Sequence, residues 1–263
     1  MPKLAANLSW IFQEVPFMER FAAAARHGFT AVEFMFPYDF PAADIARELK
    51  RHGLVQALFN LPAGDAAKGE RGLAALPGRE ADFAAALDRA LDYAKALDCR
   101  TLHVMSGLIP AGADPAPLHR TFVNNLKRAC DRTAKSGITL VLEPINRRDI
   151  PGYFTNTTGQ AKAIIAEVGA PHLRLQLDLY HLQVTEGDLA KRTEALLPLV
   201  AHVQIAGNPD RNEPDRGEAN HLHMLGLLDR LGYAGHVGLE YKPLTTTAAG
   251  LGWAAPYGIR ANP

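Results

Sequence analysis

The sequence predicts a single (β/α)8 barrel that spans residues 1–263. Short apolar runs that suit β-strands alternate eight times with longer segments, which is typical of parallel strands joined by helical crossovers. Eight such units fit a chain of 263 residues, a common size for a closed barrel. A doubly wound open sheet is the alternative, but no GxGxxG follows the first run and neither GxxxxGKS nor GxxxxGKT occurs.

The expected elements follow in order along the chain. The helical segments show apolar residues three and four positions apart, as in FAAALDRALDYAKAL (83–97). Proline near the start and glycine at the end bound two of them, and Gly137 ends another. Helices are therefore expected at 16–28, 41–53, 83–97 and 121–136. Strands are expected at 5–9, 31–35, 55–60, 101–105, 138–143, 173–178, 202–206 and 236–240.

Two long connections rich in Gly and Pro stand out, at 60–79 and 207–218. Each follows an expected strand, so each should lie on the face of the barrel formed by the carboxyl ends of the strands. Active sites of such barrels form on that face, and functional residues concentrate in its loops. Neither connection reads as a linker between domains, and the whole chain is expected to form one domain.

The overall composition excludes some functions. Lys plus Arg equals Asp plus Glu at 28 each, whereas a nucleic-acid-binding protein normally carries a basic excess. The N-terminus has no apolar signal-peptide core, and no apolar run is long enough to span a membrane. The two cysteines, Cys99 and Cys130, lack a CxxC partner and are expected to be buried, reduced thiols. A cytoplasmic protein is therefore expected, without nucleic-acid or membrane partners.

Oxygen-bearing side chains lie at or near the ends of the last four expected strands: Glu143 in LVLE, Asp178 in LQLD, Gln204 in VQIA and Glu240 in VGLE. A charged residue that closes an apolar strand needs a partner or a cation if it is buried. In a closed barrel the ends of neighbouring strands converge, so the four side chains should meet. Three carboxylates and an amide favour Mg²⁺ or Mn²⁺ as the bound cofactor over zinc.

A metal flanked by two glutamates is suited to proton transfer next to a carbonyl group. The metal can polarise a substrate carbonyl and stabilise an enediolate, while Glu143 and Glu240 remove and return a proton. Aldose–ketose isomerisation or epimerisation follows from this arrangement. Hydrolysis by a metal-bound water is a second chemistry that the same ligands allow.

The same residues lie in stretches that resemble the hydroxypyruvate isomerase family, part of the xylose isomerase-like barrel superfamily. The resemblance runs from AANLSWIF (5–12) to YGI (257–259). It implies an isomerase that interconverts hydroxypyruvate and 2-hydroxy-3-oxopropanoate, with a small hydroxy-oxo acid as partner and a homo-oligomer as a possible assembly. It also implies that Glu143, Asp178, Gln204 and Glu240 bind the metal and that both glutamates act as acid and base. The distinctive stretches are VEFMFPYDF (32–40), FNLPAGD (59–65), KGERG (68–72), LEPIN (142–146), DIPGYF (149–154), DLYH (178–181) and EYKP (240–243).

Related sugar epimerases of the superfamily imply further residues that contact the substrate. Their pattern places these roles on Asp149, on His181 and on Arg211, whose forked guanidinium suits a carboxylate. His181 could instead orient a ligand carboxylate. Lys242 lies two residues beyond Glu240, on the same side of the strand, and could hold substrate or offset the carboxylates. Those epimerases generally carry histidine at the strand-seven ligand position, so Gln204 favours the hydroxypyruvate isomerase branch.

The third loop departs from the family pattern, since Phe59 replaces a familiar histidine and Ala66 replaces an expected tryptophan. Both positions could form a wall of the pocket, which raises a four-carbon 2-oxo-tetronate as an alternative substrate. A DNA-repair endonuclease of the superfamily is a remote alternative, because such enzymes use several metals and a basic surface. A sugar-acid binding module without catalysis is a further alternative.

Three other polar residues lie in or at the end of expected strands. Glu33 at the end of the second strand is expected to be structural, and His103 is expected to be a hydrogen-bonded core histidine. Asn7 ends the first strand, from where it could reach a substrate.

Overall fold

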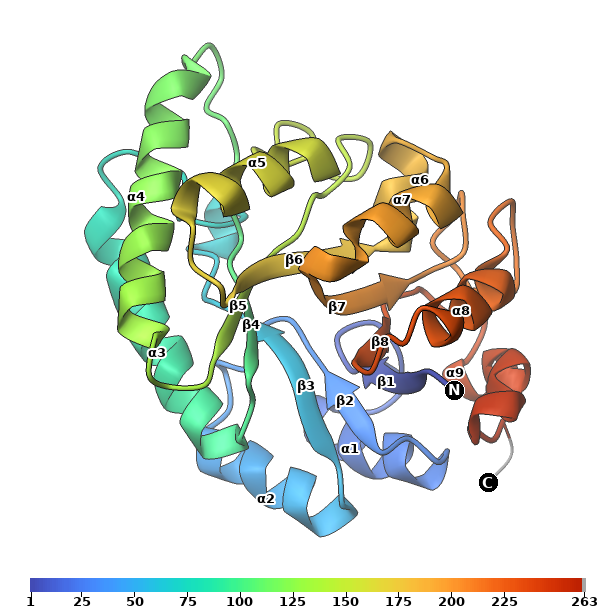
Figure 1. The fold of residues 1–263 in the computed structure, drawn as a ribbon. Coiled ribbons are helices and arrows are strands. Elements are labelled where there is room, and N and C mark those ends of the chain that lie inside the picture. The colour runs from blue at the N-terminus through green and yellow to red at the C-terminus, as the bar shows by residue number, and fades with distance from the viewer. Residues whose placement is uncertain (262–263) are drawn as a thin grey trace.

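A computed structural model describes residues 1–261 of the chain as a closed barrel of eight parallel strands in the order β1 to β8. Hydrogen-bonded pairs join each strand to the next, and β1 pairs with β8 to close the ring. Helices surround this ring on the outside (Figure 1). The predicted barrel is confirmed, and the open-sheet alternative is wrong. The strands are β1 (Lys3–Asn7), β2 (Ala31–Glu33), β3 (Val55–Asn60), β4 (Thr101–His103), β5 (Thr139–Leu142), β6 (Leu173–Asp178), β7 (Val200–Ile205) and β8 (His236–Leu239).

The helical segments follow the strands in sequence. The helices are α1 (Phe17–Arg26), α2 (Ala42–His52), α3 (Glu80–Leu97), α4 (Pro115–Thr133), α5 (Thr158–Val168), α6 (Leu179–Thr185), α7 (Leu189–Leu196), α8 (His221–Arg230) and α9 (Thr247–Gly250). Three short 3-10 helices complete the set: η1 (Ala66–Lys68), η2 (Leu197–Leu199) and η3 (Leu251–Tyr257). The four predicted helices correspond to α1, α2, α3 and α4.

Local chemistry explains where individual helices begin and end. In α2 the apolar side chains Ile45 and Leu49 are buried against the barrel, and Gly53 ends the helix in the left-handed conformation. The helix expected at 121–136 begins earlier, as α4 at Pro115. The reason is an N-cap, because the carboxylate of Asp114 accepts a hydrogen bond from the backbone N–H of Ala116.

No helix among residues 1–261 is both long enough and apolar enough to cross a membrane. Cys99 and Cys130 are buried free thiols, as the sequence predicts. Burial raises the pKa of the Cys99 thiol to about 12, so this thiol stays protonated and unreactive near neutral pH.

Candidate active site at the carboxyl ends of the strands

Four strand ends bring the predicted oxygen ligands to one end of the barrel. Asp178 ends β6 and is paired in register with Gln204 of β7, while Glu143 and Glu240 directly follow β5 and β8. All four are buried: Glu143 is 5% exposed, Asp178 2%, Gln204 1% and Glu240 8%. Buried carboxylates at this density require compensating positive charge or protons. The convergence predicted from the sequence is therefore present in the fold.

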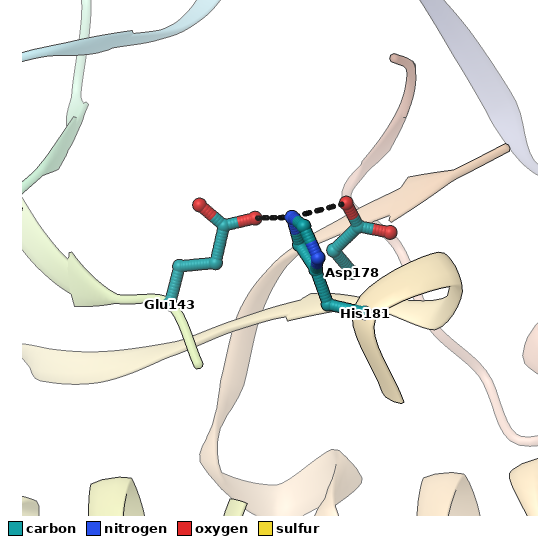
Figure 2. A group of neighbouring side chains, drawn as sticks. All are labelled: Glu143, Asp178 and His181. Atoms are coloured by element: carbon teal, nitrogen blue, oxygen red, sulfur yellow. Dashed lines mark ion pairs between the residues drawn. The ribbon is translucent and has the colours of Figure 1, made fainter. Parts of the chain in front are cut away.

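Glu143, Asp178 and His181 form one close group of possible metal ligands (Figure 2). Nε2 of His181 lies 3.8 Å from Oε1 of Glu143 and 3.6 Å from Oδ2 of Asp178. One ligand atom of each residue lies within 4.8 Å of the others, a spacing that a metal ion could bridge. Among residues 1–261, neither Oε1 of Glu143 nor Oδ2 of Asp178 has a hydrogen-bond donor. Two unpartnered buried carboxylate oxygens fit a hard divalent cation such as Mg²⁺ or Mn²⁺.

The proton on His181 can be placed from its neighbours. The backbone N–H of Asp149 donates to Oδ1 of Asn146 at 2.8 Å, so the amide nitrogen of Asn146 faces Nδ1 of His181, at 2.6 Å. Nδ1 therefore accepts, and a neutral ring carries its proton on Nε2. Burial, followed by the charge of Arg211, lowers the pKa of His181 well below its ordinary value and keeps the ring neutral. The Nε2–H then faces the carboxylate oxygens of Glu143 and Asp178 at 3.8 and 3.6 Å, beyond hydrogen-bond distance.

Gln204 lies at the predicted place but turns its amide nitrogen toward Glu240. Nε2 donates to Oε2 of Glu240 at 2.5 Å, and Oε1 accepts from Nε2 of Gln176 at 2.6 Å. A metal ligand from this residue has to be its oxygen. Gln204 would therefore bind a metal only after its amide rotates, and this ligand role remains a prediction.

Arg211 is the cation of the site. Its NH2 donates to Oε1 of Glu240 at 2.6 Å and lies 3.6 Å from Oδ2 of Asp178. The guanidinium carbon lies over the ring of Trp10, 4.4 Å from its centroid, and over the ring of Tyr180, 4.8 Å from its centroid. Its backbone has a φ of 59°, the left-handed conformation, within the connection after β7. The loop conformation and the two aromatic rings thus direct Arg211 into the carboxylate cluster.

The predicted substrate-contacting residues are only partly brought together. Oδ2 of Asp149 lies 3.4 Å from NH1 of Arg211, and Nε2 of His181 lies 3.5 Å from NH2 of the same residue. Asp149, His181 and Arg211 therefore form one group. Lys242 is exposed and lines a surface hollow with Trp10 and Gln13. Within the described part of the chain, its ammonium makes no ion pair with the carboxylates. A substrate contact by Lys242 remains a prediction.

The electrostatics of the site favour protonated carboxyl groups. Burial raises the pKa of Glu240 to about 8 and that of Asp178 to about 6, although Arg211 opposes both shifts. Burial, with the nearby charges of Glu240 and Asp178, also raises the pKa of Glu143. Without a bound cation, Glu240 is therefore a carboxyl group that holds a proton near neutral pH.

Some residues of the site are not identified by sequence reasoning. His103 was expected in the core, where it is buried, but its Nδ1 also lies 3.6 Å from Oε2 of Glu143. Burial and the charge of His202 lower its pKa to about 3, so it is neutral. Asn146 lies within the LEPIN stretch, and Trp10 within AANLSWIF, and both stretches carry the family resemblance. Their position in these stretches is the sequence feature that could have indicated a role in the site.

The third loop differs from expectation at Phe59. This side chain is fully buried and packs outside the strands against Phe34 and Tyr38, with ring centroids 6.2 and 6.4 Å away. Alternation along β3 explains the outcome, because neighbours Leu58 and Asn60 face the other side of the strand. Phe59 is therefore a core residue and not a wall of the pocket, and that expectation is wrong. Ala66 is exposed, in η1.

Comparisons with known proteins agree with this geometry. Residues 21–257 match the family model of the xylose isomerase-like TIM barrel. A 2-oxo-tetronate isomerase from Cupriavidus necator is 51% identical over 98% of this chain and 99% of its own. A hydroxypyruvate isomerase from Escherichia coli is 44% identical over 98% of this chain and 100% of its own. A crystal structure of an AP endonuclease, family 2, from Brucella melitensis has a TM-score of 0.96 at 52% identity, and covers 98% of this chain and 100% of its own.

Proposed function

The chain belongs to the xylose isomerase-like TIM barrel family, and from this premise we propose that it is an aldose–ketose isomerase of short hydroxy-oxo acids. In this proposal it interconverts hydroxypyruvate and 2-hydroxy-3-oxopropanoate through an enediolate. The observation that carries it is the meeting of two buried glutamates, Glu143 and Glu240, at the carboxyl ends of β5 and β8, beside the buried Asp178. Relatives named as isomerases cover nearly the whole chain at 51% and 44% identity.

The chemistry assigned to the chain's own groups is a proton transfer between adjacent carbons. One glutamate, as carboxylate, removes the proton from the carbon that bears the hydroxyl group. The same or the other glutamate, as carboxylic acid, returns a proton to the neighbouring carbon. The proton of the substrate hydroxyl group passes to the former carbonyl oxygen, so that the hydroxyl carbon becomes the new carbonyl. In this proposal the Nε2–H of His181 donates a hydrogen bond to a substrate oxygen, and the guanidinium of Arg211, which pairs with Glu240, attracts the substrate carboxylate.

The donor set fits a divalent metal, and Mg²⁺ or Mn²⁺ matches its chemistry. Glu143 and Asp178 would hold the ion through their unpartnered oxygens, with Glu240 beside them. Gln204 would add its oxygen only by giving up its hydrogen bonds to Glu33 and Glu240. A bound ion of this kind polarises a carbonyl group and makes the neighbouring C–H more acidic. His181 is part of the same group, but its Nδ1 accepts from Asn146, which leaves Nε2 as a donor and not a ligand.

A four-carbon 2-oxo-tetronate is the second candidate substrate. The observation that favours it is the 51% identity to the 2-oxo-tetronate isomerase from Cupriavidus necator, and the exposed Ala66 leaves the third loop without a bulky aromatic ring. The two substrates share the reacting carbons, so the catalytic groups have the same roles. A location in the cytoplasm and a homo-oligomeric assembly accompany this proposal as predictions.

An endonuclease function has weaker support, although a structure of 52% identity is described as an AP endonuclease. The equal numbers of acidic and basic residues, 28 each, give no excess of positive charge for a phosphate backbone. Failure to bind an abasic-site duplex at low salt would exclude this function directly.

The proposed function is tested with a panel of small 2-oxo and 3-oxo hydroxy acids, assayed with and without a chelator. We expect isomerisation of the three- or four-carbon acid, loss of activity with chelator, and recovery with Mg²⁺ or Mn²⁺. In D₂O, deuterium should appear at the substrate carbon. The ratio of kcat/KM for the two acids then ranks the substrates. A protein that binds these acids but exchanges no deuterium would be a binding module, and the proposal would fail.

A further inference from the structure

A buried carboxylate that has no part in the proposed chemistry lies next to Glu240. Glu33 ends β2 and is fully buried within the barrel. Its Oε2 lies 2.6 Å from Nε2 of His202, a residue of β7. Its Oε1 accepts hydrogen bonds from Nδ2 of Asn7 at 2.9 Å and from Nε2 of Gln204 at 2.7 Å. Burial of a carboxylate in this way is costly unless every lone pair is used, so the network indicates a specific role.

The two amide groups that bind Glu33 also bind Glu240. Nε2 of Gln204 donates to Oε2 of Glu240 at 2.5 Å, and Nδ2 of Asn7 donates to the same oxygen at 3.3 Å. An amide nitrogen has two hydrogens, so each amide directs one to Glu33 and one to Glu240. The pair of amides thereby ties the two carboxylates together at a fixed separation. Glu33 also determines which way Gln204 points, because only its nitrogen can face two carboxylates.

The fold reserves space for the Glu33 carboxylate. Gly238 of β8 faces it, and a Cβ atom at this position would lie 2.1 and 2.3 Å from the two carboxylate oxygens. Gly238 has no unusual backbone conformation that would call for glycine, so the space itself is the reason for this residue. Residues of β1, β2, β7 and β8 thus converge on one carboxylate directly beside the site.

We propose that Glu33, fixed by His202 and accommodated by Gly238, is a positioning residue that sets the orientation of Glu240 through Asn7 and Gln204. This proposal rests on the proposed function in taking Glu240 as catalytic. Glu33 touches no substrate in this role. Its contribution is to hold the carboxylate of Glu240 and the amide of Gln204 in one geometry, where small displacements of a catalytic group carry large costs in rate.

The test uses Gly238→Ala, which keeps every polar group and displaces the Glu33 carboxylate. We expect kcat to fall by about 30-fold while KM changes by less than about threefold, because orientation and not binding is impaired. Gly159→Ala is the matched control, since Gly159 is exposed, has an ordinary φ and leaves open space for a Cβ. The control should keep wild-type kcat.

Rescue separates positioning from simple packing. Glu33→Asp withdraws the carboxylate by one methylene group, so it lowers kcat alone but makes room for the Cβ of Gly238→Ala. The double variant should therefore be faster than the product of the two single effects predicts. Glu33→Gln is nearly isosteric and should fold. The new amide nitrogen must face His202, because Asn7 and Gln204 present donors while the ring of His202 can accept after a change of tautomer. We expect about a tenfold loss of kcat for it.

A second readout does not depend on turnover. Calorimetric titration with Mn²⁺ should show weaker binding to Gly238→Ala, by about tenfold, and unchanged binding to Gly159→Ala. Wild-type kcat and Mn²⁺ affinity in both Gly238→Ala and Glu33→Gln would overturn the positioning role. Absence of turnover in the wild-type protein would instead count against the proposed function, and the Mn²⁺ affinities would still decide the role of Glu33.

Discussion

Glu143 and Glu240 follow strands β5 and β8 of the same barrel, yet the protein surrounds their carboxylates differently. Glu240 is held on both oxygens, by Arg211 at 2.6 Å on one and by Gln204 at 2.5 Å on the other. Among residues 1–261, Oε1 of Glu143 has no donor and lies 3.8 Å from Nε2 of His181, while Oε2 lies 3.6 Å from Nδ1 of His103. The Glu240 side is thus fixed by the chain itself, whereas the Glu143 side leaves oxygens available to a cation.

The largest expected effects come from replacing either glutamate with glutamine. Both Glu143→Gln and Glu240→Gln should lower kcat on the order of 100-fold or more, the usual loss when a general acid or base is removed. The two variants should differ in stability. In Glu240→Gln an amide must face the donors Arg211 and Gln204, so its Tm should fall. Glu143 has few partners to lose, so Glu143→Gln should keep its Tm. Retention of more than about a tenth of the activity would contradict the acid–base roles.

Metal removal is expected to affect stability in a manner that depends on pH. Burial raises the pKa of Glu240 from 4.5 to about 8 and that of Asp178 from 3.8 to about 6. Between the unfolded and folded values, the folded protein binds more protons than the unfolded chain, so stability falls as pH rises. The metal-free protein should therefore lose Tm from about pH 5 to 8, and added Mn²⁺ should raise Tm more at pH 8 than at pH 5. Equal increases in Tm at both pH values would show that the ion does not offset these carboxylates.

The difference between the two glutamates marks what the sequence could reveal. Glu143, Asp178 and Glu240 could be predicted because each closes an apolar strand, and a closed barrel brings such ends together. The orientation of the Gln204 amide could not be predicted. It depends on Glu33 and Gln176 from other strands, and neither contact leaves a local pattern in the sequence.

The loops were less predictable than the strands. Arg211 reaches the cluster because of a left-handed backbone and two aromatic rings, which no periodic pattern encodes. Phe59 was expected to line the pocket from the family pattern, but strand alternation directs it into the outer core. A substitution relative to a family pattern thus carries meaning only once the direction of the side chain is known.

Arg211→Lys should show an intermediate effect and tests the fixed side of the site. Lysine keeps the charge but cannot stack on Trp10 and Tyr180 or present a planar fork, so we expect kcat/KM to fall by about tenfold, mainly through KM. Arg147→Lys is a suitable control, because Arg147 is exposed in the connection after β5. Equal kinetics for both variants would mean that Arg211 contributes only its charge.

Lys242→Ala should have the smallest effect. Although Lys242 lies two residues beyond Glu240, its side chain is exposed, lines a hollow with Trp10 and Gln13, and makes no ion pair with Glu240 within residues 1–261. Removal of an exposed, unpaired charge is usually worth less than about 1 kcal/mol, so kcat/KM should change by less than about fivefold. A rise in KM of about 30-fold or more would place the Lys242 ammonium on the substrate carboxylate, as one interpretation of the sequence predicts. In that case the fixed side of the site would extend beyond Arg211 to the loop after β8.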